Sequence, residues 1–281
     1  MTEHGLRLAF VVQRYGPDVN GGAELHCRWV AEHLTRYAEI HVFTTCAQDY
    51  ALWNNVYPAG THTLNNVQIH RFTVDASRQP RRFAQVSEKV FSQPHSHLDE
   101  LAWMREQGPV SEQLLLDIER RRDEFDVFIF FTYLYATTYF GMQLVPEKAM
   151  LVPTAHDEPT LYLSIFRATF HLPRYILYNT HAERRLVQGI FQNGGVPSVV
   201  VGTGIDVPDT VSESSFRQRY SIDTDFILYI GRLDESKNLN ELLDYYDRFA
   251  RSADQGAKLV LLGKGSLSIP QDSNILSLGF V

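Results

Sequence analysis

Short apolar runs that alternate with helical patterns constrain the fold of this chain more than any other feature. LRLAFVV at 6–12 is typical of a buried strand, and the apolar spacing at 23–37 predicts an amphipathic helix directly after it. Further strands are predicted at 40–45, 67–74, 126–131, 149–155, 175–180 and 198–202. Strands that are apolar along most of their length and are separated by helices indicate a parallel sheet covered on both faces. We therefore predict an α/β protein of the doubly wound type, whose ligands bind at the carboxyl ends of the strands.

A second α/β unit is predicted in the last part of the chain. Strand patterns at 226–231, 257–263 and 274–281 surround a helical pattern at 239–253. We predict an N-terminal domain at 1–205, a linker at 206–222 and a second, Rossmann-like domain at 223–281. Most domains have about 100–150 residues, and three strands with one long helix leave one face of a sheet open. We therefore expect this second domain to be incomplete.

The overall composition excludes some classes of protein. The formal net charge of −7 argues against a nucleic-acid partner, since nucleic-acid-binding domains carry a basic excess. RQPRR at 78–82 is a local basic cluster, for which we consider a solvated loop, or contact with an anionic acceptor or a membrane surface. The two cysteines fit a reducing cytosol, and Cys27 has the spacing of a core residue. We predict a cytoplasmic protein, and the sequence does not indicate an oligomeric state.

A glycine pair follows the first predicted strand. Gly21 and Gly22 in NGGAE allow the backbone to approach a ligand closely, and the helix that follows offers free N–H groups to an anion. A tight turn without a ligand is the alternative. The G-x-G-x-x-G spacing of a dinucleotide site is missing.

YIGRLDESKN at 229–238 is the clearest functional signal. Arg232 and Lys237 follow a predicted strand and precede a predicted helix. Two cations beside a helix N-terminus form a suitable site for a pyrophosphate. The next strand ends in LLGKGS, where Gly263 and Gly265 indicate either a plain turn or a contact to a nucleotide.

VPTAHDEPTLY at 152–162 places three chemically active residues side by side. Side chains alternate along a strand, so His156, Asp157 and Glu158 do not all point to one metal ion, and we predict no metal site. Asp157 is expected to cap a helix at 160–168. His156 is either a core residue or a site residue at the end of a strand. The aromatic run at 130–140 favours buried packing over sugar stacking.

Five motifs occur in the order seen in retaining glycosyltransferases of family 4, which have the GT-B fold. They are YGPDVNGGAE, VVGTGID, YIGRLDESKN, LVLLGKG and ILSLGFV. The resemblance is strongest at 7–45 and 199–281 and weakest at 75–125. It implies a hexosyltransferase-like enzyme that moves a sugar from a nucleotide-diphosphate donor to a glycan or lipid-linked glycan, as in polysaccharide biosynthesis. The acceptor would bind mainly to the first domain and the donor mainly to the second.

The resemblance also implies roles for single residues. Arg232 and Lys237 would hold the donor diphosphate, and Gly21 and Gly22 would face it from the first domain. His156 would lie near the sugar as the catalytic residue. Further candidates for contact with substrate are Glu24, Gly263, Gly265 and Phe280. No metal ion or other cofactor is expected, and peripheral association with the inner face of a membrane is left open.

One departure from the family pattern bears on activity. The family carries two glutamates downstream of the strand that matches ILSLGF, and the sequence given ends at Val281 before that motif. We therefore expect little or no transfer by this chain. The alternatives are a sugar-nucleotide 2-epimerase of the same fold, and a non-catalytic module that binds a partner or a glycan.

Overall fold

The computed structural model describes residues 5–207, 210, 212–252 and 256–279. The chain divides into two compact units, Met1–Gly204 and Ile205–Val281. We call them unit 1 and unit 2 and describe each by itself.

Unit 1 is built on an eight-stranded sheet with the order β3-β4-β2-β1-β5-β6-β7-β8. The strands are β1 Arg7–Val11, β2 Glu39–Thr45, β3 Gly60–Leu64, β4 Val67–Phe72, β5 Val127–Phe131, β6 Ala149–Val152, β7 Tyr175–Tyr178 and β8 Ser198–Val200. Six of the seven neighbouring pairs are parallel, and β3–β4 is antiparallel. The predicted α/β fold with a parallel sheet is confirmed.

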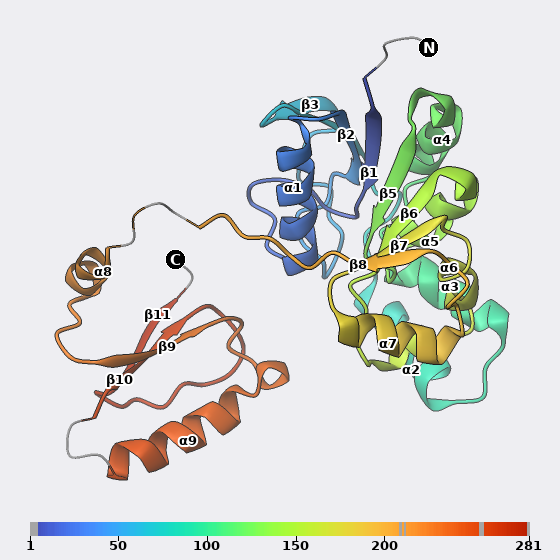
Figure 1. Ribbon diagram of the computed structural model, residues 1–281. Coiled ribbons are helices and arrows are strands. Elements are labelled where there is room, and N and C mark those ends of the chain that lie inside the picture. The colour runs from blue at the N-terminus through green and yellow to red at the C-terminus, as the bar shows by residue number, and fades with distance from the viewer. Residues whose placement is uncertain (1–4, 208–209, 211, 253–255, 280–281) are drawn as a thin grey trace. The chain divides into compact units, whose positions relative to one another are not determined.

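Helices cover both faces of this sheet. Successive side chains of the central strands point to opposite faces, and they are apolar on both. Leu8, Phe10 and Val12 belong to one buried cluster, with Cys27 and Ala31 of α1 (Gly22–Leu34). The opposite cluster takes in α3 His97–Gln107, α4 Glu112–Arg120, α5 Ala136–Leu144 and α7 His181–Phe191. Figure 1 shows α1 on one face and α4 and α5 on the other.

The edge strand β3 was not predicted by the sequence patterns. GTHTL is mostly polar, and its residues pair with β4 at the edge of the sheet. Asn65 and Asn66 form the hairpin turn with φ of 49° and 65°. Asparagine tolerates this left-handed conformation better than most residues, so the Asn-Asn pair was the available signal.

The helices of unit 1 differ from the predictions in three places. α2 Pro80–Ser92 begins inside the basic cluster at 78–82, for which a solvated loop was one of the alternatives. α3 was missed, although Ser96 and Asp99 form a capping box at its start. The helix predicted at 160–168 is broken into a 3₁₀ turn, Pro159–Tyr162, and a short helix, α6 Phe166–Thr169.

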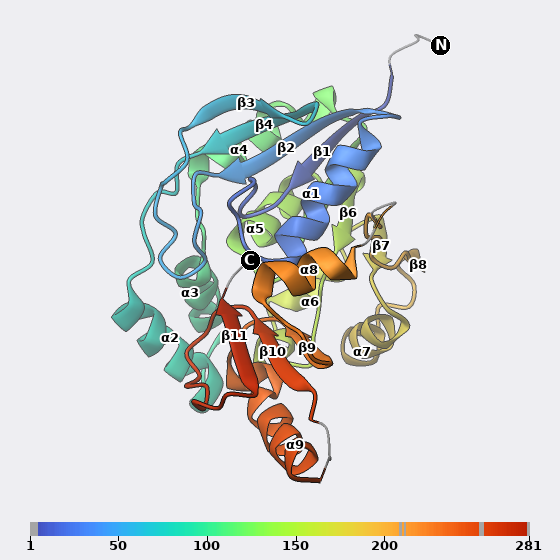
Figure 2. The same cartoon turned by 90° about the vertical axis from the view of Figure 1, so that its left-hand side faces the viewer.

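Unit 2 contains a three-stranded parallel sheet with the order β11-β10-β9. Its strands are β9 Phe226–Ile230, β10 Lys258–Leu262 and β11 Ile275–Gly279, and its helices are α8 Glu213–Tyr220 and α9 Leu239–Ser252. Figure 2 shows α9 along these strands, and its Leu239 and Tyr246 share a buried cluster with Leu259 and Leu261. The segment 206–222, predicted as a linker, contains α8.

Candidate functional site

The carboxyl ends of four neighbouring strands of unit 1 meet at one edge of the sheet. The strands β1, β5, β6 and β7 are adjacent and parallel, so the loops that follow them lie side by side. Chain order changes direction between β1 and β5, because β2 lies on the other side of β1. Ligands of open α/β sheets bind at such a switch point.

The loop after β1 is held by a buried ion pair between Arg14 and Glu24. Their side chains are only 5% and 6% exposed. Glu24 Oε1 also accepts a hydrogen bond from Gln13 Nε2 at 2.8 Å, and Arg14 Nη1 donates to the carbonyl of Gln48 at 2.9 Å. Glu24 therefore organises the loop, and its direct contact with a substrate stays a prediction.

Of the two glycines of NGGAE, only Gly21 is required by the packing around it. A Cβ atom on Gly21 would lie 2.1 Å from Glu24 Oε2, whereas a Cβ atom on Gly22 would meet nothing within 4 Å. Gly21 is therefore needed to make room for the buried carboxylate. The approach of these glycines to a ligand, which the sequence suggested, is a separate expectation that stays a prediction.

Two threonines at adjacent strand ends have unfavourable backbone conformations. Thr132 follows β5 with φ of 68°, and Thr154 follows β6 with φ of 51°. Their hydroxyl groups are 3.2 Å apart and hydrogen-bonded. β-Branched residues rarely adopt positive φ, and such strain costs about 1–3 kcal/mol and concentrates at functional sites. The sequence carries no signal for this pair, since threonine disfavours the conformation that it adopts.

The three residues of the His-Asp-Glu run are separated by their contacts. His156 is exposed. Asp157 accepts a hydrogen bond from the Tyr162 hydroxyl at 2.8 Å, and Glu158 accepts one from the Tyr133 hydroxyl at 2.9 Å. The prediction that Asp157 caps a helix was wrong, because the 3₁₀ turn at 159–162 starts without a side-chain cap.

The aromatic run after β5 is mostly buried, as the sequence predicted. Tyr133 and Tyr139 are 1% and 6% exposed. Tyr135 packs edge-on against Trp53 with ring centroids 5.5 Å apart. Burial raises the pKa of Tyr135 to about 12, and the charge of Glu24 acts in the same direction. Tyr135 therefore stays protonated at the edge of the sheet.

Glu183 is a residue of this edge that sequence reasoning missed. It lies in the first turn of α7, where the Thr180 hydroxyl accepts a hydrogen bond from the Glu183 N–H. Its own carboxylate is buried and bonds to the backbone of two loops. The signal was the spacing Thr-x-x-Glu at the start of a helix, which is typical of a capping box.

The basic cluster at 78–82 is in part structural. Arg78 is half-buried, stacks on the rings of Trp53 and Phe83, and donates to the Gln107 side chain at 3.1 Å. Arg81 and Arg82 are exposed on α2, and Arg82 Nε lies 2.7 Å from Glu106 Oε1.

Unit 2 presents its predicted cations directly after β9. Arg232 Nε lies 3.4 Å from Asp234 Oδ2, and its side chain is 58% exposed. The Tyr229 hydroxyl donates to the Arg232 carbonyl at 2.7 Å. Lys237 is exposed at the end of a 3₁₀ turn, two residues before α9 begins. Both cations thus follow the carboxyl end of a parallel strand and precede a helix, as predicted.

The glycines after β10 have a packing role. Cβ atoms on Gly263 and Gly265 would lie 1.8 Å from the Gly231 carbonyl oxygen and 2.0 Å from the Leu233 carbonyl oxygen. These glycines therefore let the loop after β10 pack against the loop that carries Arg232. Their contact with a nucleotide stays a prediction, and Phe280 lies outside the described residues.

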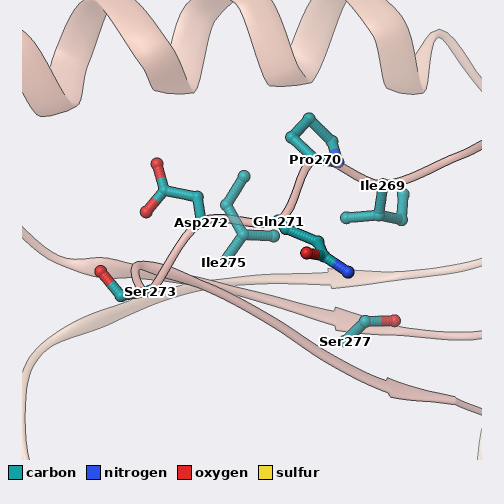
Figure 3. A pocket seen from close by; sticks show the side chains of 7 residues that line it. All are labelled: Ile269, Pro270, Gln271, Asp272, Ser273, Ile275 and Ser277. Carbon is teal, nitrogen blue, oxygen red and sulfur yellow. The ribbon is translucent and has the colours of Figure 1, made fainter.

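A pocket of about 540 Å³ lies elsewhere in unit 2 (Figure 3). Its lining consists of Ile269, Pro270, Gln271, Asp272, Ser273, Ile275 and Ser277. These residues belong to β11 and to the segment before it, and none of the seven is basic. Neither Arg232 nor Lys237 lines this pocket.

The described part of the chain contains neither a group of side chains suited to a metal ion nor a helix that could span a membrane. Within residues 5–207, 210, 212–252 and 256–279, no cluster of three or more His, Cys, Asp or Glu side chains is arranged to hold a metal ion. Over the same ranges, no helix has the length and apolarity needed to cross a bilayer.

Comparison with known proteins shows similarity at the level of structure. No family model and no curated protein matches the chain. HepE from Anabaena, crystallised with UDP and glucose, superimposes with a TM-score of 0.59 at 16% identity, over 99% of this chain and 70% of that chain. The UDP-forming α,α-trehalose-phosphate synthase from Burkholderia vietnamiensis gives 0.57 at 12% identity, over 94% of this chain and 65% of that chain. At such identities the similarity shows the fold, which is α/β of the GT-B type.

Proposed function

We propose that this chain belongs to a retaining, family 4-like glycosyltransferase that moves a sugar from a nucleotide-diphosphate donor to a hydroxyl group. The observation that carries the proposal is the position of Arg232 and Lys237 directly after β9, at the carboxyl end of a parallel strand. HepE, which shares the fold, was crystallised with UDP and, in another structure, with UDP-glucose. These complexes support a nucleotide-sugar as the substrate class.

The chemistry of sugar transfer explains why two cations suit this position. When the bond between the sugar and the diphosphate breaks, the diphosphate leaves with the electron pair and gains negative charge. Arg232 and Lys237 would stabilise that charge without a metal ion, and preorganised charges of this kind supply a large share of catalysis. In unit 1, His156 would orient the sugar, with the loop of Gly21, Gly22 and Glu24 near the donor.

The acceptor side of the proposal concerns unit 1. We infer a glycan or a lipid-linked glycan as the acceptor, bound at the carboxyl edge of the eight-stranded sheet. The exposed Arg81 and Arg82 on α2 suit an anionic acceptor or a membrane surface. A cytoplasmic enzyme that works at the inner face of the membrane would meet such an acceptor.

Calorimetry with UDP, GDP and ADP tests the nucleotide site. We expect Arg232→Ala and Lys237→Ala each to weaken nucleotide binding by about tenfold or more, since charge-assisted hydrogen bonds are the strong ones. Arg251→Ala and Lys258→Ala are matched controls, because Arg251 lies in the last turn of α9 and Lys258 begins β10. Equal losses in the four variants, or none in the first two, would refute the site.

A further inference from the structure

Glu183 joins two of the loops at the carboxyl edge of unit 1. The residue is 6% exposed. Oε1 accepts a hydrogen bond from the Ala155 N–H at 2.7 Å, and Oε2 accepts one from the Asn179 N–H at 2.7 Å. The first N–H belongs to the loop after β6 and the second to the loop after β7. One carboxylate therefore fixes the spacing between two loops.

Ordinary helix capping accounts for only one of these hydrogen bonds. Asn179 directly precedes Thr180, the N-cap of α7, so the bond to its N–H is local. The bond to Ala155 connects residues 28 positions apart and contributes nothing to the start of the helix. It acts instead on the loop after β6, in the residue that directly precedes His156.

That loop needs to be held, because its backbone is strained. Thr154 has a positive φ, which costs about 1–3 kcal/mol unless the surroundings impose it. The Thr154 side chain bonds to Thr132, and the Ala155 N–H bonds to Glu183, so the strained residue is fixed from both sides. His156 follows immediately and is exposed.

Burial of a carboxylate at this position has a cost that its hydrogen bonds offset. Burial raises the pKa of Glu183, while backbone hydrogen bonds from Ala155, Asn179 and Thr180 act in the opposite direction. An electrostatic interaction with His156 also lowers the pKa of Glu183, so the imidazole lies within electrostatic reach of the carboxylate. The start of α7 favours the negative charge as well.

We propose that Glu183 is a positioning residue for His156. Through the Ala155 N–H it holds the loop after β6 in the conformation that presents the imidazole at the carboxyl edge of the sheet. This inference rests on the proposed function for what His156 does with a sugar, but the hold on the loop is independent of it.

The test compares Glu183→Gln with a matched control, Glu100→Gln. The amide keeps the shape of the side chain but replaces one acceptor oxygen with a donor, so the two N–H groups are left with one uncharged acceptor in place of two charged ones. Glu100 is 4% exposed and accepts a hydrogen bond from the Ile165 N–H at 2.9 Å, without contact to Ala155. Glu183→Asp keeps the charge on a shorter side chain and serves as the second variant if Glu183→Gln folds poorly.

Two readouts are taken on the 281-residue chain. Amide hydrogen exchange by NMR should be about tenfold faster at Ala155 in both Glu183 variants than in Glu100→Gln, as expected for a lost bond to a charged group. The second readout is the Kd for UDP divided by the Kd for UDP-glucose. This ratio should fall by the same factor in Glu183→Gln, His156→Ala and the double variant, because all three remove the same contact between His156 and the sugar.

Each outcome decides the proposal. Unchanged exchange at Ala155 in the Glu183 variants would overturn it, and so would multiplicative effects of Glu183→Gln and His156→Ala on the Kd ratio. If the wild-type chain binds none of UDP, GDP and ADP in calorimetry, the proposed function fails, and the exchange measurement alone then decides whether Glu183 holds the loop.

Discussion

The Arg14 guanidinium and the Glu24 carboxylate form an ion pair in which both side chains are at least nine-tenths buried. Removal of one partner leaves an unpaired buried charge, which costs about 3–5 kcal/mol. We expect Glu24→Leu to lower the free energy of unfolding of unit 1 by about that amount, and Arg14→Met/Glu24→Leu to recover most of the loss. Urea unfolding followed by tryptophan fluorescence reports on unit 1 alone, because all three tryptophans lie in it.

The control for this prediction is an exposed pair in the same unit. Arg82, 70% exposed, lies 2.7 Å from Glu106, and such pairs contribute about 1 kcal/mol or less. Arg82→Ala should therefore change the stability little. If Glu24→Leu behaved like Arg82→Ala, the ion pair would not organise the loop after β1.

Gly21 and Gly22 offer a paired substitution. A Cβ on Gly21 would overlap the Glu24 carboxylate, so Gly21→Ala should destabilise unit 1 by about 1–3 kcal/mol. Gly22→Ala has open space and should stay within about 0.5 kcal/mol of wild type. The same fluorescence measurement applies, and equal effects would contradict the packing described for Gly21.

The stability of unit 1 should fall at acidic pH because of two buried histidines. His41 Nδ1 and His70 Nε2 are 2.9 Å apart, and Glu39 and Arg121 lie around the pair. Burial lowers both pKa values, that of His70 to about 4. A lowered histidine pKa means that the unfolded chain binds more protons. The contribution of these histidines to the free energy of unfolding is therefore fully present above about pH 6.5. It declines toward pH 4, by up to about 1.4 kcal/mol per pH unit for each proton.

Urea unfolding at several pH values measures the slope of the free energy of unfolding against pH. His70→Gln should flatten it between pH 6.5 and about 4. His62→Gln removes a histidine of β3 outside the pair and should leave the slope intact. An unchanged slope in His70→Gln would show that other groups cause the acid sensitivity.

Gly263 should be essential to unit 2. A Cβ there would lie 1.8 Å from the Gly231 carbonyl oxygen, and the φ of 148° disfavours other residues. We expect Gly263→Ala to speed hydrogen–deuterium exchange in β10 and α9 without change in unit 1. Gly256→Ala, which would meet nothing within 4 Å, is the control. Exchange that stayed slow in Gly263→Ala would contradict the close approach of the two loops.

The sequence predicted those parts of the fold that local patterns determine. β1 and β5 are apolar because both faces of the sheet are covered, so short apolar runs revealed them. β3 was missed because it is an edge strand with polar, mostly exposed side chains. The prediction of one helix at 160–168 was wrong, because periodicity does not show where tertiary contacts interrupt a helix.

The candidate site was predictable only in part. Arg232 and Lys237 follow β9 as their motif indicated. The pairing of Arg14 with Glu24 joins residues 10 positions apart through a folded loop, which periodicity does not reveal. The left-handed conformations of Thr132 and Thr154 oppose the local preference of threonine, so only the surrounding structure explains them.

A crystal structure with bound UDP would show whether the carboxyl end of β9 binds a nucleotide diphosphate. We expect diphosphate oxygens within hydrogen-bond distance of the Arg232 guanidinium and the Lys237 ammonium group. A diphosphate bound elsewhere, for example against Arg81 and Arg82 of α2, would contradict it.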